Sequence, residues 1–134
     1  MGFATSQVYK ICILGLEQSG KTLLCSLMKP QQKIFYTDAF SYFLHPVQDG
    51  VDFEVWDQKG KHPHLWNHHF NGVNGFIFVI DQLRADEPDG DYLTRSVKEL
   101  LNICANKFDI GLAIIVNEHR SHQPVNHLTK EWFQ

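Results

Sequence analysis

The sequence predicts an α/β fold with a mostly parallel sheet, helices on both faces and one antiparallel hairpin. Three short apolar runs, at residues 8–14, 75–80 and 112–116, have the length and composition of buried strands. Segments with apolar residues at helical spacing separate these runs, and strands that alternate with helices indicate a parallel sheet. A turn signal at residues 48–50 lies between two further strand-like segments, which indicates the hairpin.

The first half of the chain is predicted to alternate in this way. Pro30 ends the first helix, because proline cannot continue a helix. Residues 30–40 after it are expected to be irregular. The regular elements expected here are a strand over residues 8–14, a helix over 21–29, and the hairpin strands over 41–47 and 51–56.

The second half predicts two more strands and an amphipathic helix. Asp91 is expected to be the N-cap of that helix. Its apolar stripe is formed by Leu93, Val97, Leu100, Leu101, Cys104 and Phe108. The elements expected in order are a polar loop over 57–60, a short helix over 62–70, a strand over 75–80 ending at Asp81, a loop over 84–91, the helix and a strand over 112–116.

Length and composition describe one ordinary domain. The chain has 134 residues, 43% of them hydrophobic, which is sufficient for a core. Its net charge of −3 argues against a nucleic-acid binder, which would show a basic patch. Cys12, Cys25 and Cys104 lie in apolar segments without metal-like spacing, so we expect buried thiols in a reducing compartment. No secretory signal or membrane-length apolar run is visible, and a cytosolic protein is expected.

Residues 15–22 carry the chemistry. They read G-L-E-Q-S-G-K-T and fit the phosphate-loop pattern G-x-x-x-x-G-K-[ST] at every fixed position, between a predicted strand and a predicted helix. Gly15 and Gly20 let the backbone bend so that N–H groups point at phosphate oxygens. Lys21 can reach the terminal phosphates, and the Thr22 hydroxyl can bind Mg²⁺. The pattern therefore predicts a phosphate-loop NTPase fold.

Other polar residues end neighbouring strands of the predicted sheet. Asp57 follows the predicted strand over 51–56, Asp81 follows the strand over 75–80, and Asn117 follows the strand over 112–116. Ligands of parallel sheets bind beyond the carboxyl ends of the strands, where the phosphate loop also lies. We therefore expect these three residues near the bound phosphates.

Several segments together resemble the Arf-like small GTPases of the Ras superfamily. Residues 15–22 are similar to the family's G-L-D-x-x-G-K-T, and W-D-Q-K-G at 56–60 resembles W-D-x-G-G. L-W-N-H-H-F at 65–70 is similar to L-W-x-x-Y-F, and G-F-I-F-V-I-D at 75–81 to G-L-I-F-V-V-D. T-D-A-F at 37–40 is a looser match to the T-I-G-F of the first switch. These matches run in family order over most of the chain.

The resemblance implies a switch that binds GTP or GDP with Mg²⁺. It implies that Thr22, Thr37 and Asp57 hold the metal, and that the Gly60 amide senses the γ-phosphate. The hairpin would then be the segment between the two switches. The nucleotide-binding residues that it implies are Gly15, Glu17, Gln18, Ser19, Gly20, Lys21, Thr22, Leu23, Gly60 and Asn117.

The chain also departs from the family pattern. Lys59 replaces the first glycine of the second switch, and Lys61 stands at the catalytic position of the water-orienting glutamine, so slow or absent hydrolysis is expected. The base-reading N-K-x-D reads N-E-H-R at 117–120. The last base-contacting loop and the final helix are not found before residue 134, which indicates either a shortened product or a degenerate family member.

Two kinds of partner are expected besides the nucleotide. Trp56, Trp66 and Phe70 would anchor an effector protein if they are exposed on a switch. The start M-G-F-A-T-S fits the N-myristoylation pattern at Gly2 or is an ordinary first segment. A single myristoyl chain would give weak membrane association.

Other interpretations stay open at this point. His64 and His68 have the i,i+4 spacing of a metal site on a helix, although a solvated switch helix explains them as well. Three functions fit the sequence: a nucleotide switch, a pseudo-GTPase that serves as an interaction module, and a small phosphoryl-transfer kinase. The kinase lacks a visible lid. The state of residues 117–120 and of Lys61 separates the first two.

Overall fold

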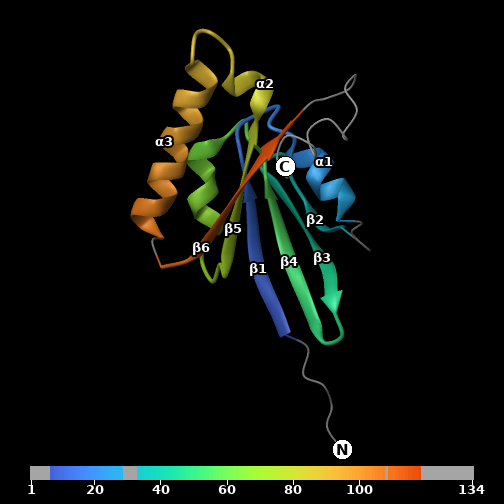
Figure 1. Cartoon of the computed structure of the whole chain (residues 1–134). Coiled ribbons are helices and arrows are strands. Elements are labelled where there is room, and N and C mark those ends of the chain that lie inside the picture. The colour runs from blue at the N-terminus through green and yellow to red at the C-terminus, as the bar shows by residue number, and fades with distance from the viewer. Residues whose placement is uncertain (1–6, 29–32, 108, 119–134) are drawn as a thin grey trace, which may run out of the picture.

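The computed structural model describes residues 7–28, 33–107 and 109–118. Its centre is a six-stranded sheet with the strand order β2-β3-β4-β1-β5-β6 (Figure 1). The strands are β1 (Gln7–Leu14), β2 (Lys33–Tyr36), β3 (Phe40–Gln48), β4 (Val51–Gln58), β5 (Gly75–Asp81) and β6 (Gly111–Asn117).

Pairing in the sheet is mostly parallel. β1 lies between β4 and β5 and pairs with both in parallel, and β6 pairs with β5 in parallel. β3 pairs antiparallel with β4 and β2. Turn residues 49 and 50 join β3 to β4 as the sequence predicts. The predicted α/β class and the antiparallel hairpin are confirmed.

Helices cover both faces of the sheet. α1 (Lys21–Leu27) lies on one side, and the 3₁₀ helix η1 (Pro63–His69) and α3 (Asp91–Asn106) lie on the other (Figure 1). The short α2 (Gln82–Ala85) follows β5. Two core clusters correspond to these faces: Cys12 packs with Phe78 and Ile103 in one, and Ile13 packs with Cys25 in the other. Alternating strand residues thus supply both cores, which is why β1 and β5 are apolar at almost every position.

The structure corrects three expectations around the hairpin and β5. Residues 33–36, expected to be irregular, form β2, because they find a partner in β3. The strand expected to end at residue 56 continues through Gln58, because β3 supplies partners for both added residues. Part of the expected loop over 84–91 is helical, since α2 begins directly after β5.

Two further corrections concern α3. Gly90, in the left-handed conformation at φ +67°, is the N-cap, and Asp91 is the first helical residue. Leu93, Val97 and Leu101 are exposed, by 40%, 43% and 64%, although the sequence predicted them in the buried stripe. The helix instead buries Tyr92, Ser96 and Ile103, which also lie at helical spacing. Phe108 lies outside the described residues.

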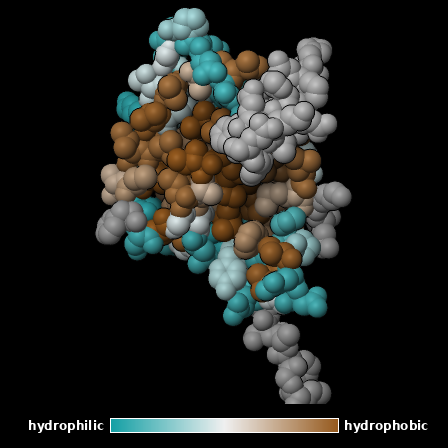
Figure 2. Space-filling view, viewed as in Figure 1, coloured by the Kyte–Doolittle hydropathy of each residue, from teal (hydrophilic) through white to brown (hydrophobic). Residues whose placement is uncertain are grey.

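One face of the molecule is strongly apolar. Figure 2 shows hydrophobic residues gathered over β6 and the adjoining part of α3. Ile114 and Val116 are each about half exposed there. β6 pairs only with β5 among the described strands. In the described part of the chain, no helix is long and apolar enough to cross a membrane.

Candidate functional site

The phosphate loop lies between β1 and α1, as the motif predicts. Its backbone turns at Gly15 (φ +151°), Gln18 (φ +62°) and Gly20 (φ +101°). A side chain at Gly15 would bring its Cβ within 2.6 Å of the Val79 carbonyl oxygen, so only glycine fits against β5 there. The loop therefore has the bent backbone that directs N–H groups toward a phosphate.

Lys21 is buried and lies inside the curve of this loop. Its ammonium donates to the carbonyl oxygen of Gly15 at 2.6 Å and to that of Leu16 at 3.3 Å, and it lies 3.5 Å from Ser19 Oγ. Burial lowers the pKa of Lys21 to about 8, the Asp57 carboxylate opposes this shift, and Lys59 adds to it. The loop thus positions a cation whose charge is only partly neutralised by Asp57, because Lys59 acts in the opposite direction.

Two segments distant in sequence pack directly on the loop. A Cβ on Gly60 would overlap backbone atoms of Leu16 and Glu17, so the chain after β4 lies against the loop. A Cβ on Gly20 would overlap the Asn117 side-chain amide, so the end of β6 braces the loop from another side. The carboxyl ends of β1, β4 and β6 thus meet where the sequence predicted a site.

A cavity of about 360 Å³ opens beside the loop. Its walls come from the loop, α1, the turn before β3, the end of β4 and the segment after it: Glu17, Gln18, Lys21, Thr22, Asp38, Asp57, Lys59, Gly60 and Lys61. A smaller hollow of about 310 Å³ lies over residues 18–22. Most predicted nucleotide-binding residues therefore line one connected region, whereas Leu23 lines neither hollow and is 55% exposed.

The expected Mg²⁺ ligands are only partly assembled. Thr22 and Asp57 line the same cavity. The Thr37 hydroxyl donates to the Phe40 carbonyl at 3.0 Å and accepts from the Ala39 and Phe40 amides, so its own turn occupies it. Lys59 lines the same cavity. Mg²⁺ can complete its octahedral shell with waters and phosphate oxygens, but the positive charge of Lys59 beside Thr22 and Asp57 opposes a divalent cation, so the described side chains fit it poorly.

Sequence reasoning missed three contributors to the site. Asp38 and Lys59 line the main cavity. Arg84 Nη1 donates to the Glu17 carbonyl at 3.0 Å and so ties α2 to the phosphate loop. Strand alternation could have found Lys59, because it follows Asp57 by two residues. Arg84 carries no comparable pattern, since α2 lies in a segment with the composition of a loop.

The comparison with known families agrees with this geometry. The sequence model of the ADP-ribosylation factor family matches residues 2–133. The chain belongs to this family. The family comprises small GTPases that act as GTP-binding switches in trafficking.

Lys61 of this ADP-ribosylation factor family chain is exposed at the edge of the cavity. The family resemblance predicts a water-orienting glutamine at its position. A lysine ammonium donates hydrogen bonds and accepts none, whereas a glutamine amide does both. Lys61 therefore offers only hydrogen-bond donors at the edge of the cavity beside the phosphate loop.

An aromatic cluster lies on the hairpin, on the opposite face from Asp57. The Trp56 ring stacks on Phe40 at 5.0 Å and on Tyr42 at 4.6 Å between ring centres, and His69 of η1 lies 4.1 Å from Phe40. The Lys10 ammonium lies 4.3 Å from the centre of the Trp56 ring. All five residues are half-buried, so the cluster is reachable from solvent.

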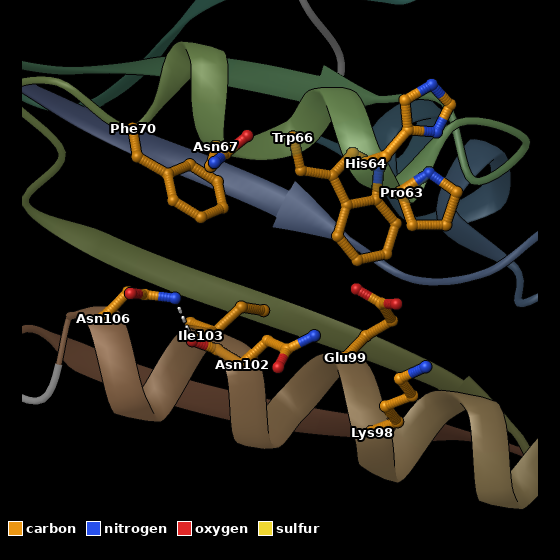
Figure 3. Close-up of a pocket in the computed structure, with 10 residues that line it drawn as sticks. All are labelled: Pro63, His64, Trp66, Asn67, Phe70, Lys98, Glu99, Asn102, Ile103 and Asn106. Atoms are coloured by element: carbon orange, nitrogen blue, oxygen red, sulfur yellow. Dashed lines mark hydrogen bonds between the residues drawn. The ribbon is translucent and has the colours of Figure 1, made fainter.

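Trp66 and Phe70, expected to be exposed anchors, belong to the core. They are 2% and 6% exposed, because η1 turns them toward α3. Both line a cavity of about 310 Å³ between η1 and α3, opposite Glu99 and Ile103 (Figure 3). This cavity shares no lining residue with the phosphate loop. Of the three expected anchors, only Trp56 remains accessible on the surface.

The remaining candidates are histidines and cysteines. His64 and His68 lie on a 3₁₀ helix, in which residues three apart align, so their spacing of four does not place them on one line. Among the residues that the structure covers, no group of three or more metal-binding side chains is found. Burial raises the pKa of Cys12 and of Cys25 to about 12, whereas Cys104, expected to be buried, is exposed.

Two predictions fall outside the described residues. The N-myristoylation pattern at Gly2 lies in the segment 1–6, and the base-reading positions 119 and 120 follow the last described residue. Both stay predictions. Asn117 and Glu118, which precede those positions, end the described chain next to the phosphate loop.

Proposed function

We propose that this chain is a phosphate-loop switch that binds guanine nucleotides and turns them over slowly or not at all. The observation that carries the proposal is the position of Lys21. It is a buried cation inside a loop whose bent backbone accommodates only glycine at positions 15 and 20. Gly60 and Asn117 pack on that loop from two further strands, so phosphate binding is coupled to the segment after β4. We propose that this coupling forms the switch.

The proposal is tested by titration with a fluorescent guanine nucleotide. Wild type is expected to bind, and Lys21→Ala is expected to abolish binding, because Lys21 is the cation that the loop's own carbonyl oxygens hold in place. Lys98→Ala, on exposed α3 surface, is the matched control that removes one lysine and keeps the affinity. Equal affinity of wild type and Lys21→Ala would refute the assignment.

Slow hydrolysis is proposed from Lys61. Its ammonium cannot accept a hydrogen bond from the attacking water, although it can stabilise charge on a phosphate, so triphosphate binding survives while turnover falls. Single-turnover assays are expected to show little product from wild type and a substantial gain for Lys61→Gln. Brisk turnover by wild type would contradict this proposal.

A pseudo-GTPase is the second candidate, and the accessible aromatic cluster favours it. Trp56 and its neighbours form a surface that an effector protein can contact whether or not nucleotide is hydrolysed. Nucleotide that co-purifies with the protein would favour the switch. Its absence, together with failure of the titration, would favour the interaction module. Acylation at Gly2 would add weak membrane association. Mass spectrometry of the protein from eukaryotic cells would detect the acyl group.

A further inference from the structure

The phosphate site contains a lysine in an unusual place. Lys59 follows β4 directly, and its backbone N–H donates to the Ala39 carbonyl at 2.9 Å, so pairing with β3 continues to this residue. Side chains alternate along a strand, and Val55 and Asp57 both face the side that α1 covers. Lys59 is next in that series, and it is half-buried.

The cavities locate Lys59 more closely. A further hollow of about 370 Å³ lies between α1 and the hairpin, next to the main cavity. Three residues line both hollows: Thr22, Asp57 and Lys59. The ammonium-bearing side chain therefore shares its surroundings with the two side chains that the family pattern assigns to the divalent cation.

Electrostatics agree with this location. The charges of both Asp57 and Lys59 act on the buried groups Lys21 and Cys25, in opposite directions. A cation between the Thr22 hydroxyl and the Asp57 carboxylate would meet the positive charge of Lys59. An ammonium has three N–H donors, which suit a hydroxyl, a carboxylate and a phosphate oxygen at the same time.

We propose that the Lys59 ammonium takes the place of the divalent cation at this site, so that the chain binds nucleotide di- and triphosphates without Mg²⁺. The inference rests on the proposed nucleotide binding and concerns its metal requirement. Thr37, the third ligand of the family pattern, is engaged in its own turn and lines neither hollow.

The test compares the affinity for fluorescent GDP and for a fluorescent non-hydrolysable GTP analogue in excess Mg²⁺ and in excess chelator. The wild-type affinity is expected to change by less than about threefold. Lys59→Gly and Lys59→Gln are expected to bind at least about tenfold more tightly with Mg²⁺ than without it. Lys98→Gln is the matched control, because it removes an exposed lysine on α3 that lines neither hollow, and it should keep the wild-type behaviour.

Electron paramagnetic resonance of Mn²⁺ gives a second readout. With wild type and GDP, the Mn²⁺ spectrum should match that of free nucleotide, whereas Lys59→Gly should immobilise the ion. Circular dichroism confirms that each variant is folded.

The outcomes separate this inference from the function on which it rests. A wild type that loses about tenfold or more affinity in chelator overturns the inference and leaves nucleotide binding established. The inference is also overturned if Lys59→Gly and Lys59→Gln bind nucleotide equally well with and without Mg²⁺. If Lys59→Gly binds nucleotide with Mg²⁺ and wild type does not bind it, Lys59 blocks the site and the inference is overturned. No binding by any variant in either condition would refute the proposed function together with the inference.

Discussion

At the scale of single residues, Lys21 shows how burial and function are connected. The ammonium is held by carbonyl oxygens of its own loop, in a place where water is largely excluded. Desolvation opposes the charge, and the pKa falls to about 8 from a usual 10.5. A phosphate that enters the loop would favour the charged form again, so binding and protonation are linked.

This linkage predicts a pH dependence of nucleotide affinity. Below about pH 8 the free site is already protonated, so affinity should stay level from about pH 7 to 8. Above it, binding must take up a proton, and affinity should fall by up to about tenfold per pH unit. Titrations of fluorescent GDP across this range measure the slope.

Lys21→Arg is the control for the pH experiment. A guanidinium stays protonated throughout, so the variant should bind with an affinity that does not follow this fall. If the nucleotide affinity of wild type stays level up to about pH 9.5, Lys21 keeps its charge in the free site and the prediction is wrong.

At the scale of elements, α3 carries two apolar stripes and only one of them packs. Tyr92, Ser96 and Ile103 face the sheet and η1, and the Tyr92 hydroxyl accepts a hydrogen bond from the backbone N–H of Asp81 at 2.9 Å. Leu93, Val97 and Leu101 lie on the exposed side. Helical spacing alone does not distinguish these stripes, because both repeat every three to four residues.

Truncation of the two stripes should therefore have unequal costs. Ile103→Ala should lower the free energy of unfolding by about 2–5 kcal/mol, because it leaves a void in the core that includes Phe76 and Trp66. Leu101→Ala should change it by less than about 0.5 kcal/mol, since its side chain is 64% exposed. Urea unfolding of both variants measures the difference, and equal losses would show that the outer stripe is covered in solution.

At the scale of the whole molecule, nucleotide binding should stabilise the fold through the meeting of β1, β4 and β6 at the loop. Ligand at a hundred times its dissociation constant stabilises a protein by about 2.7 kcal/mol, which corresponds to several degrees in melting temperature. In the proposed complex, the phosphates would contact described residues of the loop. The base would lie beyond Asn117, next to Glu118 and the positions 119 and 120.

GDP and ADP are therefore expected to raise the melting temperature by similar amounts. The family motif reads guanine through an aspartate that accepts from the base, whereas Arg120 has donors only, so base-specific hydrogen bonds are lost at about 1–3 kcal/mol each. Thermal unfolding at matched nucleotide concentrations measures this. A preference for GDP of more than about a thousandfold, or about 4 kcal/mol, would show that another group reads the base.

Local pattern by itself determined the central part of this protein. Strands β1, β5 and β6 and the helix of residues 91–106 follow from residue periodicity, and the phosphate loop follows from fixed glycine and lysine positions. These features could be predicted because each depends on residues close together in sequence. The position of Asn117 beside the loop followed from the rule for parallel sheets, whereas that of Gly60 was implied by the family resemblance.

Only the tertiary structure decided the features that depend on partners far away in the chain. β2 forms because β3 is there to pair with it, and β4 extends to Gln58 for the same reason. That extension places Lys59 beside Asp57 and Thr22, on the face that α1 covers. The choice between the two stripes of α3 is likewise made by the shape of the sheet and of η1, because burial is a property of the surfaces that meet and not of either sequence segment alone.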